Sequence, residues 1–142
     1  MNLNKILIIH GPNLNLLGIR EPDVYGQDSQ NQLFSFIDSS FPEIEFIFFQ
    51  SNHEGVIIDT LHKHRNLVDA IIINAGALSH YSYAIRDAIK AIYIPTVEVH
   101  LSNVNEREPF RTKLVLSDVC LETIYGKGRK GYLDAINKLK DI

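Results

Sequence analysis

Short apolar runs alternate along this chain with longer segments whose apolar residues recur at helical spacing, and this alternation limits the fold more than any other feature. The runs predict five strands, at Lys5–His10, Ile44–Gln50, Val68–Asn74, Thr96–His100 and Val119–Tyr125. The helical spacing predicts helices at about 29–40, 54–64 and 79–91, and a last one after Lys130. The connection 101–118 is the least regular, because Glu108-Pro109 interrupts any long helix there.

Strands that alternate with helices at these lengths favour a parallel sheet. Parallel neighbours need a crossover connection, and crossovers that contain helices cover both faces of the sheet. We therefore predict an α/β fold of flavodoxin-like type, with a five-stranded parallel sheet in the order 2-1-3-4-5. No linker, repeat or low-complexity segment divides the chain, so we expect residues 1–142 to form a single domain.

Composition narrows the classes of partner. The net charge is −3 and the basic side chains are scattered, except for Lys127, Arg129 and Lys130, which argues against a nucleic-acid or membrane surface. No apolar run is long enough to span a bilayer and no leader segment is recognisable, so we expect a cytoplasmic protein that acts on a small molecule. Cys120 is the only cysteine, and its apolar neighbours favour a buried small residue over a nucleophile.

The predicted strands end in polar residues, and those ends are where an open α/β sheet binds its ligands. The four ends read His10-Gly-Pro-Asn-Leu-Asn, Gln50-Ser-Asn-His-Glu-Gly, Asn74-Ala-Gly and Glu98-Val-His-Leu-Ser-Asn. Amides, imidazoles and hydroxyls therefore gather at one edge of the sheet. Such a crevice suits a polyhydroxylated or carboxylated substrate better than a flat apolar cofactor.

The segment 20–26, Arg-Glu-Pro-Asp-Val-Tyr-Gly, is too polar and too long for a simple connection between strand and helix. A fixed cation beside a phenol favours the phenolate, so Arg20 and Tyr25 could together supply a proton acceptor near neutral pH. An exposed pair without function would have the same sequence, so the pair counts only together with the strand ends. The length and the glycines of residues 16–27 also predict a mobile lid over the crevice.

The chain resembles the type II 3-dehydroquinate dehydratases, the small dehydroquinases of the shikimate pathway or of quinate breakdown. The resemblance covers nearly the whole length. It rests on ordered blocks that include Gly11-Pro-Asn-Leu-Asn, Leu17-Gly, Arg20-Glu-Pro, Tyr25-Gly, Gln50-Ser-Asn-His-Glu-Gly, Asn74-Ala-Gly-Ala with His80, Arg86-Asp-Ala, Glu98-Val-His-Leu-Ser-Asn, Arg107-Glu-Pro-Phe-Arg and Gly131-Tyr. It implies a flavodoxin-like hydro-lyase that needs no metal or other cofactor and usually assembles as a dodecamer of trimers.

The resemblance also implies catalytic roles. Tyr25 would remove the proton beside the substrate ketone, with Arg20 holding it as phenolate. Asn13 would position a water or a donor at the enolate oxygen, because the charge that forms there needs preorganised donors. His100 would protonate the departing hydroxyl as general acid, and Glu98, on the same face of its strand, could orient or charge that imidazole. A strand-end carboxylate without such a role remains the alternative for Glu98.

Substrate-binding residues follow from the same resemblance. Asn74 and the backbone amides of Leu101 and Ser102 would bind the substrate carboxylate. The ring hydroxyls would contact His80, Arg111 and Asp87. Asp87 lies two turns into its predicted helix and reaches its own crevice poorly, so it would serve the site of a neighbouring subunit.

The sequence leaves a runner-up, a binding module of flavodoxin-like type that holds a flavin or receives a phosphoryl group. A flavin needs a Ser/Thr/Gly loop after the first strand, and a receiver needs an aspartate at the end of the third. The chain has Asn13 and Asn74 at these places. The run Gly126-Lys-Gly-Arg-Lys-Gly mimics a dinucleotide motif, but only eleven residues follow it, too few for another strand and its acidic ribose partner.

Departures from the family pattern occur outside the catalytic positions. Thr112-Lys113 follows Arg111 where many members have histidine, and Asn105 replaces a common histidine. The connection from Tyr25 to Gln50 is shorter than in many relatives. We expect these changes to affect affinity, ordering of the lid and packing between subunits rather than the reaction.

Overall fold

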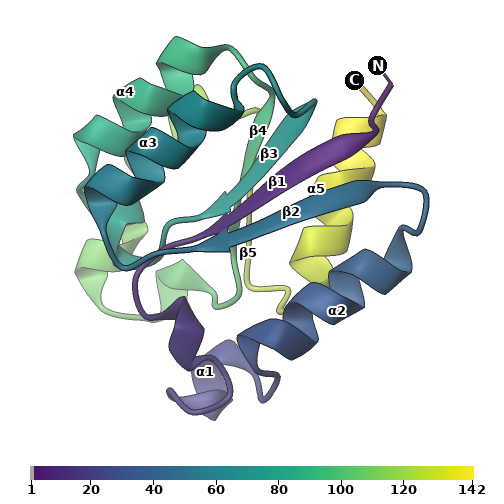
Figure 1. The fold of residues 1–142 in the computed structure, drawn as a ribbon. Helices are drawn as coiled ribbons and strands as arrows, with labels where there is room; N and C mark the ends of the chain where they lie inside the picture. Colours follow the sequence, from purple (N-terminus) through teal and green to yellow (C-terminus); the bar gives the residue numbers. More distant parts are fainter. Residues whose placement is uncertain (1) are drawn as a thin grey trace.

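The structure is a computed structural model that describes residues 2–142, and its centre is one parallel sheet (Figure 1). The strands follow the order β2-β1-β3-β4-β5, which confirms the predicted topology. Their bounds are β1 Lys5–His10, β2 Glu45–Gln50, β3 Ala70–Asn74, β4 Thr96–His100 and β5 Glu122–Tyr125. The helices are α1 Pro22–Tyr25, α2 Gln30–Ser40, α3 Glu54–His64, α4 Tyr83–Ile92 and α5 Lys130–Lys140.

Two helices cover each face of the sheet. On one face Ile6 and Ile8 of β1 pack with apolar side chains of α2 and α5. On the other face Leu7 and Ile9 pack with side chains of α3 and α4. Successive residues of β1 thus serve opposite cores, because strand side chains alternate in direction. Figure 1 shows the two pairs of helices on either side of the sheet, with the chain termini at the end opposite α1.

Capping residues set where the helices begin. Ser29 caps α2: its hydroxyl accepts from the backbone N–H of Gln32, and the Gln32 side chain accepts from the N–H of Ser29. Ser82 caps α4 by accepting from the N–H of Ile85. The predicted start of α4 at residue 79 was therefore early, since residues 76–80 form a short 3₁₀ helix instead.

The connection 101–118 contains no α-helix but three short 3₁₀ helices, at Val104–Glu106, Pro109–Thr112 and Ser117–Val119. The last of these explains why β5 begins at Glu122 and not at Val119 as predicted. Within residues 2–142, no helix is long and apolar enough to cross a membrane.

Candidate active site

The carboxyl ends of β1, β3 and β4 and the segment 14–25 enclose a narrow cleft. Its lining is Leu14, Arg20, Tyr25, Asn74, Gly76, Ala77, His80, His100, Leu101, Ser102, Val104, Arg107 and Arg111. Three arginines and no acidic side chain of residues 2–142 line this cleft, so it favours an anionic ligand.

A close turn brings the ends of β1 and β3 together beneath the cleft. Gly11 follows β1, and its N–H donates to the carbonyl of Asn74 at 2.8 Å. A Cβ on Gly11 would lie 2.3 Å from the carbonyl oxygen of Ala75, so only glycine fits there. The Gly-Pro-Asn block is thus needed for the approach of two strand ends.

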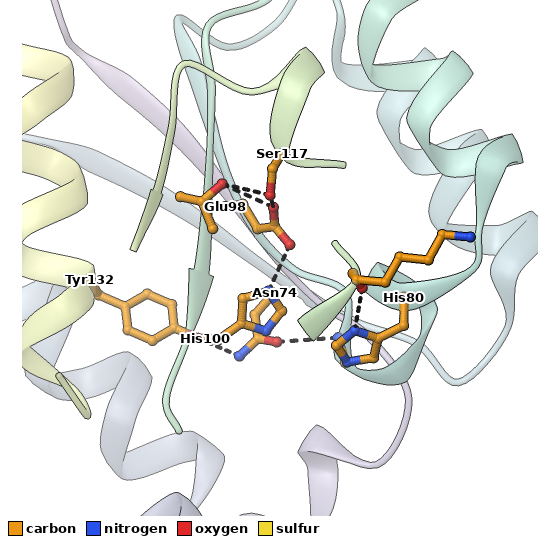
Figure 2. Close-up of polar contacts among 9 residues, drawn as sticks. Asn74, His80, Glu98, His100, Ser117 and Tyr132 are labelled. Carbon is orange, nitrogen blue, oxygen red and sulfur yellow. Dashed lines mark hydrogen bonds and ion pairs between the residues drawn. The ribbon is translucent and has the colours of Figure 1, made fainter. Parts of the chain in front are cut away.

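His100 lies at the end of β4 and contacts a carboxylate behind the cleft. Its Nε2 is 2.7 Å from Oε2 of Glu98, which is fully buried (Figure 2). The other carboxylate oxygen accepts from the hydroxyls of Ser117 at 2.9 Å and Thr123 at 3.2 Å. Because both oxygens are bonded, Glu98 is fixed in place and can stabilise positive charge on the imidazole. His100 Nδ1 has no hydrogen-bond partner among residues 2–142.

Tyr25, the last residue of α1, lies between two guanidinium groups. The Cζ of Arg20 is 4.5 Å from the centre of its ring, and the Cζ of Arg107 is 4.8 Å away. Arg107 is held by Ser102, to whose Oγ it donates at 3.3 Å, and by Glu21 at 3.8 Å. Two cations beside one phenol would stabilise negative charge on that oxygen. Arg107 is thus a second cation beside Tyr25, in addition to the predicted Arg20.

His80 is a neutral partner beside His100. Its Nδ1–H donates to the carbonyl of Lys113 at 2.9 Å, which leaves Nε2 as an acceptor. Burial lowers the pKa of His80 below its ordinary value, and the nearby His100 and Arg111 act in the same direction. The two imidazole rings stack with centroids 6.2 Å apart. His80 is therefore suited to accept a hydrogen bond from a substrate hydroxyl.

The structure brings most of the predicted site residues together. Eight of them line the cleft: Arg20, Tyr25, Asn74, His80, His100, Leu101, Ser102 and Arg111. Glu98 lies behind His100. Asn13 is exposed at the rim, where its backbone N–H donates to Oδ1 of Asn52 at 3.0 Å, and Asp87 is exposed on α4; neither lines the cleft.

Sequence reasoning missed the residues that support the site from behind. Ser117 and Thr123 hold Glu98, yet they lie in a 3₁₀ helix and in β5 and belong to no motif. Tyr132 accepts from Nδ2 of Asn74 at 3.3 Å, but its spacing in the last helix indicates only an apolar position. The block Gly131-Tyr was a signal in the sequence, because a tyrosine at an apolar helix position needs a partner for its hydroxyl.

A second hollow, of about 360 Å³, shares Tyr25 and Leu101 with the cleft in its lining. Asp28 and Arg129 pair at 3.3 Å in its wall, and it contains no histidine. Cys120 lies elsewhere, and burial raises the pKa of its thiol to about 12, which agrees with the predicted apolar role. Among residues 2–142 no group of three or more His, Cys, Asp or Glu side chains is placed to hold a metal ion.

The chain is similar to known proteins over almost its whole length. The family model for class II dehydroquinases matches residues 4–140. A 3-dehydroquinate dehydratase of Caldicellulosiruptor saccharolyticus is 53% identical over 99% of both chains, and one of Halothermothrix orenii is 47% identical over 99% of this chain and 96% of the other. The crystal structure of a type II dehydroquinase from Butyrivibrio crossotus superposes with a TM-score of 0.94 at 49% identity, covering 99% of both chains.

Proposed function

The chain belongs to the class II dehydroquinase family, and from this premise we propose that it is a 3-dehydroquinate dehydratase, a hydro-lyase that converts 3-dehydroquinate into 3-dehydroshikimate and water. The observation that carries the proposal is the arrangement of Tyr25 under two guanidinium groups and of the Glu98–His100 pair at one cleft. This one cleft therefore holds both a candidate base and a candidate acid.

The reaction divides between these two groups. The Tyr25 phenolate removes the proton from the carbon beside the ketone, and the electron pair moves onto the ketone oxygen as an enolate. Asn13 positions a water or a donor at that oxygen. His100 then gives a proton to the hydroxyl on the next carbon as its C–O bond breaks, the enolate collapses to a conjugated enone, and water leaves. Glu98 stabilises the imidazolium before the proton is transferred.

Substrate binding uses the rest of the cleft. Asn74 and the backbone amides of Leu101 and Ser102 bind the carboxylate. His80 and Arg111 bind ring hydroxyls, and Arg111 is oriented for this by Glu108, to whose Oε2 its Nε donates at 2.8 Å. Asp87 completes the site of a neighbouring subunit, in an assembly built of trimers and most simply a dodecamer. The enzyme is one catalytic domain and works in the cytoplasm without a cofactor.

The runner-up, a flavin-binding or phospho-receiver module, is not favoured. The family match and its relatives point to a lyase. At the carboxyl ends of β1 and β3, where those modules need a phosphate loop and an aspartate, the structure has the tight Gly11 turn and the amide of Asn74.

The test is a direct assay. Purified protein mixed with 3-dehydroquinate should produce the ultraviolet absorbance of a conjugated enone. Quinate is the matched control substrate: it has the same ring and carboxylate but no ketone to acidify the neighbouring proton, so it should give no signal. A protein that folds and gives no enone from dehydroquinate would refute the proposal.

A further inference from the structure

A buried line of hydrogen bonds runs from the surface of α2 to Asn74 in the cleft. His10 Nδ1 is 2.9 Å from Oε1 of Gln30, His10 Nε2 is 2.7 Å from the hydroxyl of Tyr132, and that hydroxyl is 3.3 Å from Nδ2 of Asn74. His10 and Tyr132 are fully buried. We call these four residues the buried chain. Figure 2 shows its last link, with Tyr132 reaching from α5 to Asn74.

The members come from four elements that meet at one end of the sheet. His10 and Asn74 are the last residues of the neighbouring strands β1 and β3 and pair with each other in the sheet register. Gln30 begins α2, and Tyr132 lies in the first turn of α5. Both helices cover the same face of the sheet. The buried chain therefore connects the helix layer to a residue of the cleft.

The backbone of Gly76 fixes the direction of every bond in the buried chain. Its N–H, which can only donate, points to Asn74 at 3.2 Å, so the atom of the amide that faces it is Oδ1. Nδ2 of Asn74 therefore faces Tyr132 and donates to the phenol oxygen. The hydroxyl hydrogen of Tyr132 must then go to His10.

His10 completes the sequence of donors. Its Nε2 accepts from Tyr132, so the ring proton is on Nδ1 and is donated to the side-chain oxygen Oε1 of Gln30. A second ring proton would face the tyrosine hydroxyl and leave the phenol hydrogen without a partner in a fully buried place. Burial acts in the same direction by lowering the pKa of His10 to about 4.

Asn74 is thus held at both ends of its amide. Gly76 occupies Oδ1 and Tyr132 occupies one hydrogen of Nδ2, while the second hydrogen has no partner among residues 2–142. Because Asn74 lines the cleft, that hydrogen is the group it can offer a ligand. If the amide turned over, it would present its carbonyl oxygen, which repels a carboxylate.

We propose that Tyr132 is a positioning residue that acts through Asn74: its hydroxyl, oriented by His10, keeps the Asn74 amide turned with its N–H toward the cleft and so selects an anionic group at that point. The inference rests on the proposed function, in which Asn74 binds the substrate carboxylate.

Tyr132→Phe tests this with the smallest change, because it removes one oxygen and keeps the ring that packs in the core. We expect KM to rise about tenfold, the effect of one lost hydrogen bond, with kcat changed much less. The matched control is Tyr125→Phe, which also removes a tyrosine hydroxyl bonded to an asparagine amide, at 3.0 Å from Asn105, but outside the cleft. KM of the control should match the wild type.

A double-mutant cycle separates positioning from a general structural effect. Asn74→Ala should itself raise KM, and Tyr132→Phe should raise it no further in that background, because the residue it positions is gone. An equal rise of KM in both backgrounds would refute action through Asn74. If the wild type produced no enone at all, the proposed function would be wrong, and the KM comparisons could not be made.

A spectroscopic test needs no activity and no variant. Nitrogen-15 NMR of the wild-type histidines should show His10 neutral at pH 7 with its proton on Nδ1. A proton on Nε2, or a charged ring, would reverse the direction of the buried chain and overturn the proposal even in an active enzyme.

Discussion

At the scale of single residues, Tyr25 and His100 line the same cleft but have opposite electrostatic neighbours. Arg20 and Arg107 place positive charge over the phenol. Glu98 places negative charge 2.7 Å from the imidazole. In the proposed mechanism, these opposite neighbours favour a base role for Tyr25 and an acid role for His100.

This division predicts different defects for two variants. Tyr25→Phe should lose about 10²–10⁴-fold in kcat, the usual contribution of a general base, and should also stop exchange of the substrate alpha proton with deuterated solvent. His100→Ala should lose dehydration to a similar degree but retain the exchange, since the enolate still forms. Proton NMR of the substrate in D₂O measures both. The exposed variant His62→Ala is the control, and loss of exchange in His100→Ala as complete as in Tyr25→Phe would contradict the two roles.

His10 predicts how stability depends on pH. Its pKa is about 4 in the folded protein and 6.5 in the unfolded chain, so the unfolded chain binds more protons between these values. This pKa difference contributes about 3 kcal/mol to the free energy of unfolding. The contribution is fully present above pH 6.5 and is lost as the pH falls toward 4. In denaturant unfolding, the free energy of unfolding of His10→Gln should fall less steeply over this pH range than that of the wild type. His62→Gln should follow the wild type; identical curves for His10→Gln and the wild type would contradict the argument.

At the scale of elements, the sequence predicts a strand well where an apolar run is sharply bounded. β1 and β4 were predicted to the residue, because Asn4 and Pro95 precede the two runs and each run ends at a histidine. The start of β5 was wrong by three residues, since Val119 and Cys120 are as apolar as a strand, but Val119 ends a 3₁₀ helix and Cys120 follows it directly. The polar residues at the predicted strand ends correctly indicated where the candidate site lies. The link from Tyr132 to Asn74 joins positions 58 residues apart, and no local pattern carries that information.

Two glycines, Gly11 at the contact between the ends of β1 and β3 and Gly55 in α3, should respond in opposite ways to substitution by alanine. Gly11→Ala should destabilise the fold by about 1–3 kcal/mol, since the new Cβ would lie 2.3 Å from the oxygen of Ala75 and the strands cannot separate freely. Gly55→Ala, in the first turn of α3 with open space around it, should stabilise by about 0.4–1 kcal/mol. Denaturant unfolding measures both. A Gly11→Ala protein as stable as the wild type would contradict the close approach.

Residues 16–27 include Arg20 and the proposed base Tyr25, which both line the cleft, so we expect this segment to open and close around the substrate. Opening should expose the bond after Arg20, which follows the highly exposed Ile19. We expect trypsin to cut there, and a saturating cyclic carboxylate such as quinate to slow the cut by favouring the closed state. Cleavage after Arg65, exposed at the end of α3, is the internal control. Equal rates after Arg20 with and without ligand would mean that the segment does not close on it.

At the scale of the whole molecule, no acidic side chain among residues 2–142 of one chain lines the cleft. Its lining holds three arginines. The carboxylates beside it are already paired, Glu98 with His100, Glu21 with Arg107 and Glu108 with Arg111. Asp87 is exposed on α4 and does not line the cleft of its own chain. This placement supports the proposal that Asp87 contacts the substrate of a neighbouring subunit. The assembly would then be part of the active site.

Mixed oligomers test that proposal without any assumption about their size. Asp87→Ala should weaken substrate binding about tenfold, through one lost hydrogen bond to a charged group, and Tyr25→Phe should be inactive. When the two variants are unfolded together and refolded, each site needs Tyr25 from one chain and Asp87 from its neighbour. In a head-to-tail ring about a quarter of the sites then combine both intact residues and should turn over with the wild-type KM. Refolding each variant alone is the control. If Asp87 instead served its own chain, no mixed site would be complete, and the mixture would show only the high KM of Asp87→Ala.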